Sequence, residues 1–353
     1  MHNLGPLAGR GSGGNDRARA EAFLGQVLSN RYRVDSLVAM GGLGAVYAGE
    51  HVHMRKRVAI KILHASAEQE PEFVRRFERE AIAGAHVQHP NVAVATDFGE
   101  IGQGSHFLVL EYIQGVSLSE LIARGPMPVG RALHIARQIA SALEAIHAMG
   151  IVHRDLKPLN IMVAEEQGDL VKLIDFGFAK VPVDRLTSQS PGGRGDLPKR
   201  LTRQGMVFGT LSYLAPEAAE GMDSIEAPAD LYALGLMLYE MVAGKHPFAA
   251  EDPIELFEQQ RFAPPPLIAE RAPGVDVPMA LELLILRLLA KDPRRRFEDA
   301  TALIAGLDEV GAGLGLDLSG VSRSSRMSTR PPAMPGGFST FGAQLVTIPP
   351  AGP

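Results

Sequence analysis

The sequence predicts an α+β protein in which a small antiparallel, sheet-rich part is followed by a larger, mainly helical part. Between about Tyr32 and Tyr112 short β-rich runs dominate, for example 58–63 and 107–110. One helix interrupts them, with Pro71 at a first-turn position. Beyond Tyr112, apolar residues recur at three- and four-residue spacing, which predicts long amphipathic helices. Such residues are Ala132, Ala136, Ile139, Leu143 and Ile146, then Leu231, Leu234 and Leu238. A cleft between the two parts is the expected ligand site.

The bulk composition excludes several classes of function. The chain has 353 residues, enough for two or three folding units, and 46% of them are hydrophobic, enough for a sizeable core. The formal net charge is −5, from 40 acidic and 35 basic side chains, so we expect no nucleic acid among its partners. The absence of cysteine excludes disulfides and thiolate chemistry and fits a reducing compartment.

The hydrophobic runs predict no membrane span. The first thirty residues lack the apolar segment of a signal peptide. No run reaches the roughly 18 apolar residues that cross a bilayer, and 280–290 is interrupted by Glu282 and Arg287. We therefore expect a cytoplasmic protein whose input comes from the cytoplasm or through partners.

Composition also sets the expected boundaries. Residues 1–30 are expected to be a disordered segment, since the first 22 or so are rich in glycine and arginine without apolar periodicity. The N-terminal lobe is expected over 31–113 and the C-terminal lobe over 114–310. A Gly/Ser/Pro-rich tail, 311–353, is expected to be disordered. That tail is either a solvated linker or a regulatory, autophosphorylated segment.

A glycine-rich turn spans Met40 to Tyr47. Its glycines allow a tight hairpin whose backbone can approach phosphates. Such turns are common between strands, so the pattern alone is weak evidence for a phosphate site. The downstream lysine, Lys61, strengthens it.

Lys61 lies in an otherwise apolar, β-branched run, where a lysine is costly to bury without a partner. It is either an edge-strand lysine facing solvent or one half of an ion pair. On the following helix Phe73, Phe77, Glu80 and Gly84 share one face, so Glu80 points inward. We expect Lys61 and Glu80 to pair, which leaves the lysine close to anionic oxygens.

Polar residues with catalytic chemistry are concentrated in 153–160. Asp155 is placed to accept a proton or orient a hydroxyl, Lys157 to neutralise a phosphate, and Asn160 to offer an oxygen to a hard cation. A lone aspartate in a loop is usually a turn former, but this ordered set is not. A strand then delivers Asp175 to its end, completing an oxygen-rich cation site with Asn160. Phosphoryl transfer needs this kind of alignment and charge neutralisation.

The ordered motifs resemble those of the eukaryotic-type (Hanks-type) serine/threonine protein kinases, in their bacterial form. The resemblance covers about 31–308 and implies the two-lobed protein-kinase fold. The matching segments are the glycine loop, 58–61, 153–160, 175–177 and 215–217, with His89 to Asn91 adding a bacterial character.

The resemblance also implies roles. Lys61, held by Glu80, would contact the α- and β-phosphates of ATP. Asp155 would orient the substrate hydroxyl and accept its proton, and Lys157 would contact the γ-phosphate. Asn160 and Asp175 would bind Mg²⁺, for which Mn²⁺ can substitute.

A nucleotide pocket and a structural frame follow from the same resemblance. Leu110 falls at the gatekeeper position and Glu111 to Ile113 at the hinge. Asp230 would brace the catalytic loop, and Glu217 would pair with Arg296. The expected nucleotide-binding residues are Val38, Ala39, Met40, Gly41, Gly42, Gly44, Val46, Ala59, Lys61, Leu110, Glu111 and Ile113.

Two departures from the family pattern stand out. Ala39 replaces the first glycine of the loop, from which we expect weakened or altered nucleotide affinity. The activation segment, 175–217, carries an insertion at 184–203 that is either a disordered loop or a phosphorylation-controlled element. Arg154, before the catalytic aspartate, favours phosphate control. The candidate phosphosites are Thr202 first, then Thr187, Ser188 and Ser190.

The sequence therefore predicts an ATP-dependent serine/threonine kinase that autophosphorylates on its activation segment. Its expected partners are proteins with phosphorylatable serine or threonine, and a transient dimer for trans-autophosphorylation. Two alternatives stay open. A nucleotide-binding pseudokinase scaffold is supported by Ala39 alone, whereas a small-molecule kinase of the same fold is disfavoured by the 215–217 element.

Overall fold

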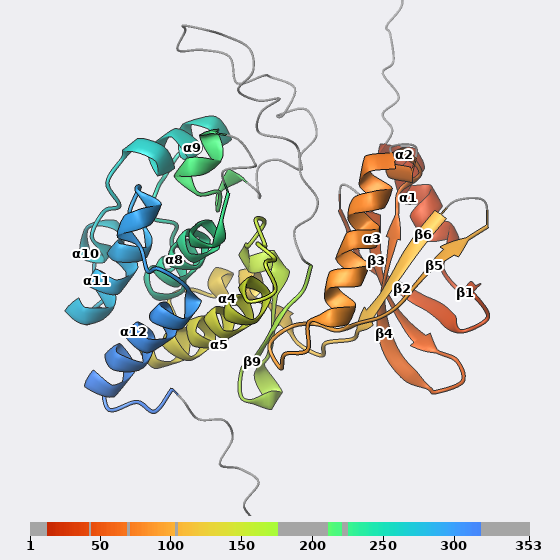
Figure 1. Cartoon of the computed structure of the whole chain (residues 1–353), viewed down its shortest axis with the longest axis horizontal. Helices are drawn as coiled ribbons and strands as arrows, with labels where there is room; N and C mark the ends of the chain where they lie inside the picture. Colours follow the sequence, from red (N-terminus) through yellow and green to blue (C-terminus); the bar gives the residue numbers. More distant parts are fainter. Residues whose placement is uncertain are drawn as a thin grey trace, which may run out of the picture. The chain divides into compact units, whose positions relative to one another are not determined.

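The computed structural model describes residues 13–41, 44–68, 71–102, 105–175, 211–220 and 225–318 (Figure 1). Several predicted site residues lie outside these ranges. They are Gly42, Thr187, Ser188, Ser190 and Thr202.

In the described residues, six strands form one antiparallel sheet in the order β1-β2-β3-β4-β6-β5. They are β1 (Val27–Leu28), β2 (Tyr32–Met40), β3 (Gly44–His51), β4 (Lys56–Leu63), β5 (Ala95–Ile101) and β6 (Ser105–Glu111). Side chains alternate between the two faces of a strand. On β4, Ile60 and Ile62 therefore join an apolar cluster on the outer face, whereas Lys61 points to the opposite face with Leu63.

Helix α3 (Pro71–His86) covers that opposite face and begins at the proline that marked it in the sequence. It lies against β5 (Figure 1). Phe77 and Ala81 pack with Leu63 and Leu108 in a second apolar cluster, which also holds the short helix α2 (Ala65–Glu68). Apolar burial on this side of the sheet fixes the rotation of α3 and hence the direction of Glu80.

The first part of the chain differs from the expected disorder. Instead of remaining irregular to residue 30, it forms helix α1 (Gly13–Ala22) and then the short strand β1. Ala20 is buried in the outer-face cluster, and its carbonyl accepts a hydrogen bond from the hydroxyl of Tyr47 at 2.9 Å. Only a few residues of this helix contact the sheet. Its polar, glycine-rich sequence therefore lacks the apolar periodicity from which a helix is predicted.

The rest of the described chain is mainly helical. Its helices are α4 (Leu118–Ala123), α5 (Val129–His147), α8 (Ala227–Ala243), α9 (Pro253–Phe262), α10 (Ile268–Arg271), α11 (Met279–Leu288) and α12 (Ala300–Gly313). Single 3-10 turns occur at Pro158–Asn160, Glu165–Gln167, Pro216–Glu220 and Pro293–Arg295. A small antiparallel sheet has the order β7-β8-β9, formed by Val116–Ser117, Ile161–Ala164 and Leu170–Leu173.

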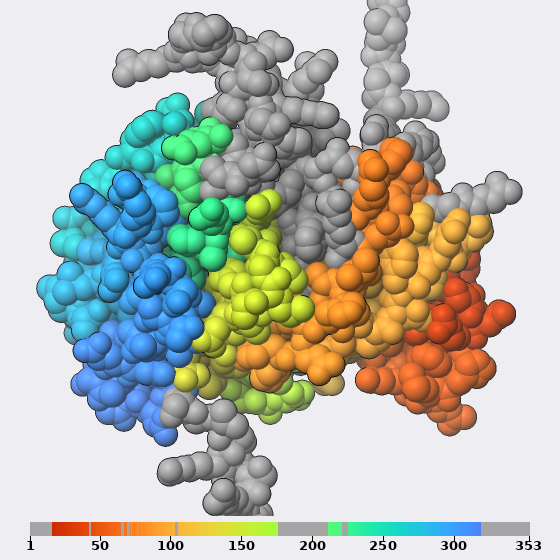
Figure 2. Space-filling view, in the orientation of Figure 1, coloured from red at the N-terminus to blue at the C-terminus, as the bar shows by residue number. Residues whose placement is uncertain are grey.

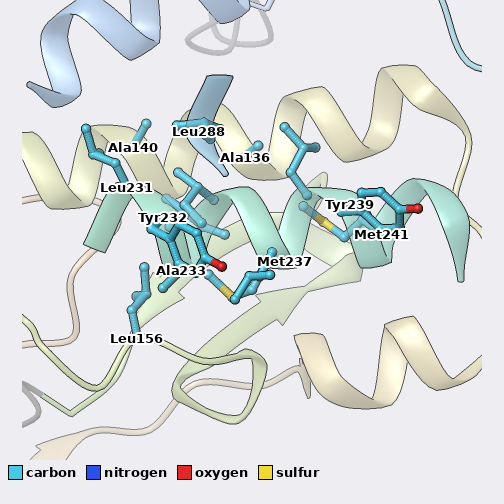
Figure 3. Close-up of a cluster of buried hydrophobic side chains, with 14 of the residues drawn as sticks. Ala136, Ala140, Leu156, Leu231, Tyr232, Ala233, Met237, Tyr239, Met241 and Leu288 are labelled. Atoms are coloured by element: carbon cyan, nitrogen blue, oxygen red, sulfur yellow. The ribbon is translucent and has the colours of Figure 1, made fainter. Parts of the chain in front are cut away.

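Helix α8 forms the centre of this part. It is apolar on all sides, as expected of a helix enclosed by neighbours, and it packs against α5 and α11. Figure 3 shows Leu231, Met237 and Tyr239 of α8 among Ala136 and Ala140 of α5 and Leu288 of α11. Leu156, from the loop that precedes β8, reaches the same cluster. Each such buried side chain contributes about 1.5–3 kcal/mol, so Leu156 anchors its loop to the core.

Helix α12 also packs against α5. Arg137 of α5 donates to both carboxylate oxygens of Asp308 on α12, at 2.6 and 3.1 Å. Figure 2 shows α12, in blue, on the surface. Among the helices of the described ranges, none combines the length and the apolar character that a bilayer span requires.

Candidate active site

Lys61 connects two carboxylates from distant parts of the chain. Its ammonium nitrogen Nζ lies 2.7 and 3.0 Å from Oε1 and Oε2 of Glu80, and 3.0 Å from Oδ2 of Asp175. β4 supplies the lysine, α3 supplies Glu80, and the segment after β9 supplies Asp175. The structure thus brings together three of the residues that the sequence singled out.

This cluster places two carboxyl groups against one ammonium group. Burial and the charge of Asp175 raise the pKa of Glu80 above its ordinary value, although Lys61 lies against it. Burial alone would also raise the pKa of Asp175, but the charge of Lys61 holds it below the ordinary value. A single lysine therefore does not neutralise both carboxylates. A further cation at Asp175 would relieve the repulsion between them.

Asp175 has φ = +79°, in the left-handed region that non-glycine residues rarely adopt. Such a conformation persists only where surrounding contacts hold it. The ion pair with Lys61 is one contact that holds the Asp175 carboxylate at this point.

The catalytic-loop candidates form a second cluster. Lys157 Nζ lies 2.9 Å from Oδ2 of Asp155, and Asn160 Nδ2 donates to the carbonyl of Asp155 at 2.9 Å. Asn160 lies in the 3-10 turn and is buried, and within the described residues its amide nitrogen donates to the carbonyl and the carboxylate of Asp155. Its side-chain oxygen can therefore serve a hard cation, together with the carboxylate of Asp175.

The carboxylate of Asp230 anchors the loop 153–160 through hydrogen bonds to its backbone. This carboxylate is 1% exposed and accepts from the backbone N–H of His153 at 2.9 Å and of Arg154 at 2.8 Å. His147, at the end of α5, makes a third hydrogen bond at 2.8 Å. Burial alone would raise the pKa of Asp230, but the hydrogen bond and charge of His147 and the charge of His153 lower it.

Arg154 also has a left-handed backbone, with φ = +62°. The bond from its N–H to Asp230 fixes that conformation, and Asp155 follows immediately in the chain. The guanidinium Nε of Arg154 donates to the carbonyl of Ile225 at 3.2 Å. The loop is therefore tied to the N-terminal end of α8 through both backbone and side chain.

Glu217 and Arg296 form a buried pair with two parallel hydrogen bonds of 2.7 Å. The Arg296 side chain is fully buried. Its remaining donors go to the carbonyls of Ala290, Pro228 and Lys291. This pair joins the end of the activation segment to the residue that follows the 3-10 turn Pro293–Arg295.

The expected hinge begins at Glu111, the last residue of β6. Ala59 pairs with Leu110 across β4 and β6, and Leu110 packs at the edge of the α3 cluster. The Glu111 N–H donates to the carbonyl of Val94 at 3.0 Å, and the Val94 N–H donates back to the Glu111 carboxylate at 3.0 Å. Ile113, two residues further on, lies in an irregular segment and is partly exposed.

Sequence reasoning missed Lys172. Its Nζ lies 2.7 Å from Oε1 of Glu111, and its side chain is 15% exposed. Lys172 lies on β9, three residues before Asp175, so the pair connects the hinge to the strand that delivers that aspartate. The signal was available, since a lysine within the run Val171 to Ile174 needs a partner, as Lys61 does.

The glycine loop joins β2 and β3. The Gly41 N–H donates to the carbonyl of Gly44 at 2.8 Å, and His64 bonds the Gly41 carbonyl at 2.9 Å. A Cβ at Gly44 would lie 2.2 Å from the carbonyl oxygen of Ile62, so this glycine is required by close packing. Val46 pairs with Lys61 across the same strands.

Ala39 lies within β2, pairs with Val46, and is exposed. Its φ is not positive, so its methyl group causes no left-handed strain. The flanking Val38 and Met40 are likewise exposed. Any effect of Ala39 on nucleotide affinity must then arise from contact with the ligand, not from backbone strain.

Comparison with known proteins gives a family. The protein kinase domain model matches residues 32–305. The serine/threonine-protein kinase pkn3 of Myxococcus xanthus is 36% identical over 82% of this chain and 52% of its own length. PknB of Mycobacterium leprae is 33% identical over 81% of this chain and 44% of its own length. The chain thus spans about half the length, or less, of these curated relatives.

Solved structures agree on the fold. The crystal structure of the Mycobacterium tuberculosis PknI kinase domain has a TM-score of 0.59 and 26% identity, covering 81% of this chain and 98% of its own. Rad53 in complex with AMP-PNP has a TM-score of 0.59 and 25% identity, covering 77% of this chain and 63% of its own. These likenesses confirm the predicted two-lobed kinase fold and the bacterial character of the resemblance. The chain belongs to the protein kinase domain family.

Proposed function

We propose that this chain is a serine/threonine protein kinase that transfers the γ-phosphate of ATP to hydroxyl groups of proteins. The observation that carries the proposal is the convergence of Lys61, Glu80 and Asp175 with a second cluster of Asp155, Lys157 and Asn160. The relatives are named serine/threonine kinases, and one similar structure contains AMP-PNP, a nucleotide analogue.

Each residue has a defined task in this reaction. Asp155 holds the acceptor hydroxyl and takes its proton while the hydroxyl oxygen bonds to the γ-phosphorus. The bond from that phosphorus to the β-phosphate oxygen breaks, and ADP leaves. Lys157 and Lys61 neutralise phosphate charge on either side of the transferred group.

The chain also has the ligands for a divalent cation. The oxygen of Asn160 and the carboxylate of Asp175 would hold Mg²⁺, or Mn²⁺ in its place, because both are hard oxygen donors. The two carboxyl groups around the single ammonium group of Lys61 fit such a cation. When bound, the metal supplies charge neutralisation to the phosphates.

Regulation and location belong to the same proposal. Thr202 is the first candidate for autophosphorylation, followed by Thr187, Ser188 and Ser190, all outside the described residues. Phosphate there would pair with Arg154, and transfer between two copies would need a transient dimer. We place the protein in the cytoplasm, without a nucleic-acid partner.

Incubation of the chain with Mg²⁺ and ATP, followed by intact-mass and phosphopeptide measurement, tests this function. The wild type should gain phosphate on serine or threonine, whereas Asp155→Asn should gain none. Asp169→Asn is a matched control, because Asp169 pairs with Arg131 outside the site. The proposal fails if the wild type phosphorylates neither itself nor a generic protein substrate.

A further inference from the structure

Helix α1 lies before the residues that the family model matches, yet it is packed onto the sheet. Ala20 is 3% exposed in the outer-face cluster, and its carbonyl accepts from Tyr47. Phe23 follows the helix and packs edge-on against the Tyr47 ring, with centroids 6.3 Å apart. Two apolar contacts and one buried hydrogen bond therefore fix α1 on the outer face.

Arg19 extends from this helix toward α2. Its Nη2 lies 3.0 and 3.3 Å from the carboxylate oxygens of Glu68 and also donates to the hydroxyl of Ser105 at the start of β6. The side chains of Arg19 and Glu68 are 29% and 14% exposed. Because the pair is largely shielded from water, it is screened less than a surface ion pair.

Helix α2 is in turn packed with α3. Ala67, adjacent to Glu68, is 3% exposed and belongs to the cluster that contains Phe77 and Ala81 of α3. Ala81 follows Glu80 directly, so a displacement of α2 disturbs the surface on which α3 rests. The contacts thus run from α1, through Arg19 and α2, to the carboxylate that holds Lys61.

We propose that Arg19 is a positioning residue, and that α1 holds α2 so that α3 keeps Glu80 within reach of Lys61. The inference rests on the proposed kinase function, to which it adds a control element outside the family-matched residues. A modification or partner that drew α1 away from the sheet would loosen α3 and weaken nucleotide binding.

The experiment compares Arg19→Ala, Glu68→Ala and the double variant in the full chain. Amide hydrogen exchange is followed over 71–86 of α3 without nucleotide, with α8 as internal reference. We expect exchange in α3 to accelerate about three- to tenfold in each single variant, with no further change in the double variant. Arg17→Ala is the matched control, because Arg17 lies on the same helix and forms an exposed ion pair with Glu21.

Kinetics provide a second measurement. KM for ATP should rise about three- to tenfold in Arg19→Ala with a smaller change in kcat, and Arg19→Lys should restore most of the loss. The proposal is overturned if amide exchange in α3 is no faster in Arg19→Ala than in Arg17→Ala. Additive single-variant effects would also overturn it, as would equal acceleration of α3 and α8, which indicates general destabilisation. If the wild type lacks kinase activity, exchange still decides the positioning role.

Discussion

Replacing Asp230 by asparagine should disable the catalytic loop while retaining the shape of the buried side chain. In the wild type, Oδ2 accepts from His147 and from the His153 N–H, and Oδ1 accepts from the Arg154 N–H. Asparagine keeps one oxygen. Whichever way the amide turns, its NH₂ group faces an N–H donor whose hydrogen bond a carboxylate oxygen accepts in the wild type.

The magnitude follows from these contacts. A hydrogen bond to a charged group is worth about 1.5–3 kcal/mol, and a buried N–H without an acceptor costs about 1–3 kcal/mol. We therefore expect a loss of about 3–5 kcal/mol in unfolding free energy. The orientation that keeps two of the three hydrogen bonds leaves the oxygen at the Oδ2 position and turns the amide nitrogen toward the Arg154 N–H. Arg154 then loses the bond that stabilises its left-handed backbone, a conformation that is unfavourable by about 1–2 kcal/mol for a residue other than glycine. The loop should relax, and a displacement of Asp155 by about 1 Å would lower kcat roughly a hundredfold.

Urea denaturation and initial rates of phosphoryl transfer measure the two effects. Asp308→Asn is the control, because Asp308 also pairs with an arginine between helices but is 36% exposed and contacts no catalytic residue in the described chain. It should lose at most about 1 kcal/mol, with kcat unchanged. Wild-type stability and kcat in Asp230→Asn would refute the role assigned to this carboxylate.

Three further predictions concern other buried charges. Arg296→Lys should lower the unfolding free energy, measured in urea, by about 3–5 kcal/mol, because three donors replace the five that bind Glu217 and three backbone carbonyls. A loss under about 1 kcal/mol would contradict this. Burial raises the pKa of Glu240 to about 7, so its contribution to stability is present below about pH 4.5 and lost as pH rises through 7. Between pH 5 and 8 the unfolding free energy of the wild type, obtained from denaturation midpoints, should therefore decline by about 2–3 kcal/mol more than that of Glu240→Gln. Identical pH slopes for the two proteins would count against this prediction. Lys172→Met should raise KM for ATP about three- to tenfold by releasing the Glu111 carboxylate at the hinge, whereas an unchanged KM would exclude that role.

Local periodicity and the cost of burying charge were enough to predict part of the site. The spacing on α3 indicated that Glu80 faces inward, and an apolar strand indicated that Lys61 needs a partner; the two lie 2.7 Å apart. The same reasoning did not reveal that Lys61 also contacts Asp175. That contact depends on how segments more than a hundred residues apart are brought together, which no local pattern encodes.

The pair of Lys172 and Glu111 shows the same limit. Both residues needed partners, but either could have met a different charge. Helix α1 was missed for another reason, since its few anchoring residues, Ala20 and Arg19, stand among glycine and exposed charges. Its formation depends on the sheet it covers, so propensity along the chain carried little signal.

The folded unit extends past the family-matched residues at both ends. A fragment restricted to 32–305 would begin at the first residue of β2 and stop within α12. It would lack Ala20 and Leu28 on one side and Leu307 on the other, all of them buried in the full chain. The uncovered apolar surface around Tyr47 would favour self-association, so such a fragment should be poorly soluble. A protein that spans 13–318 keeps α1 and β1 at one end and the complete α12 at the other, so these apolar surfaces stay covered.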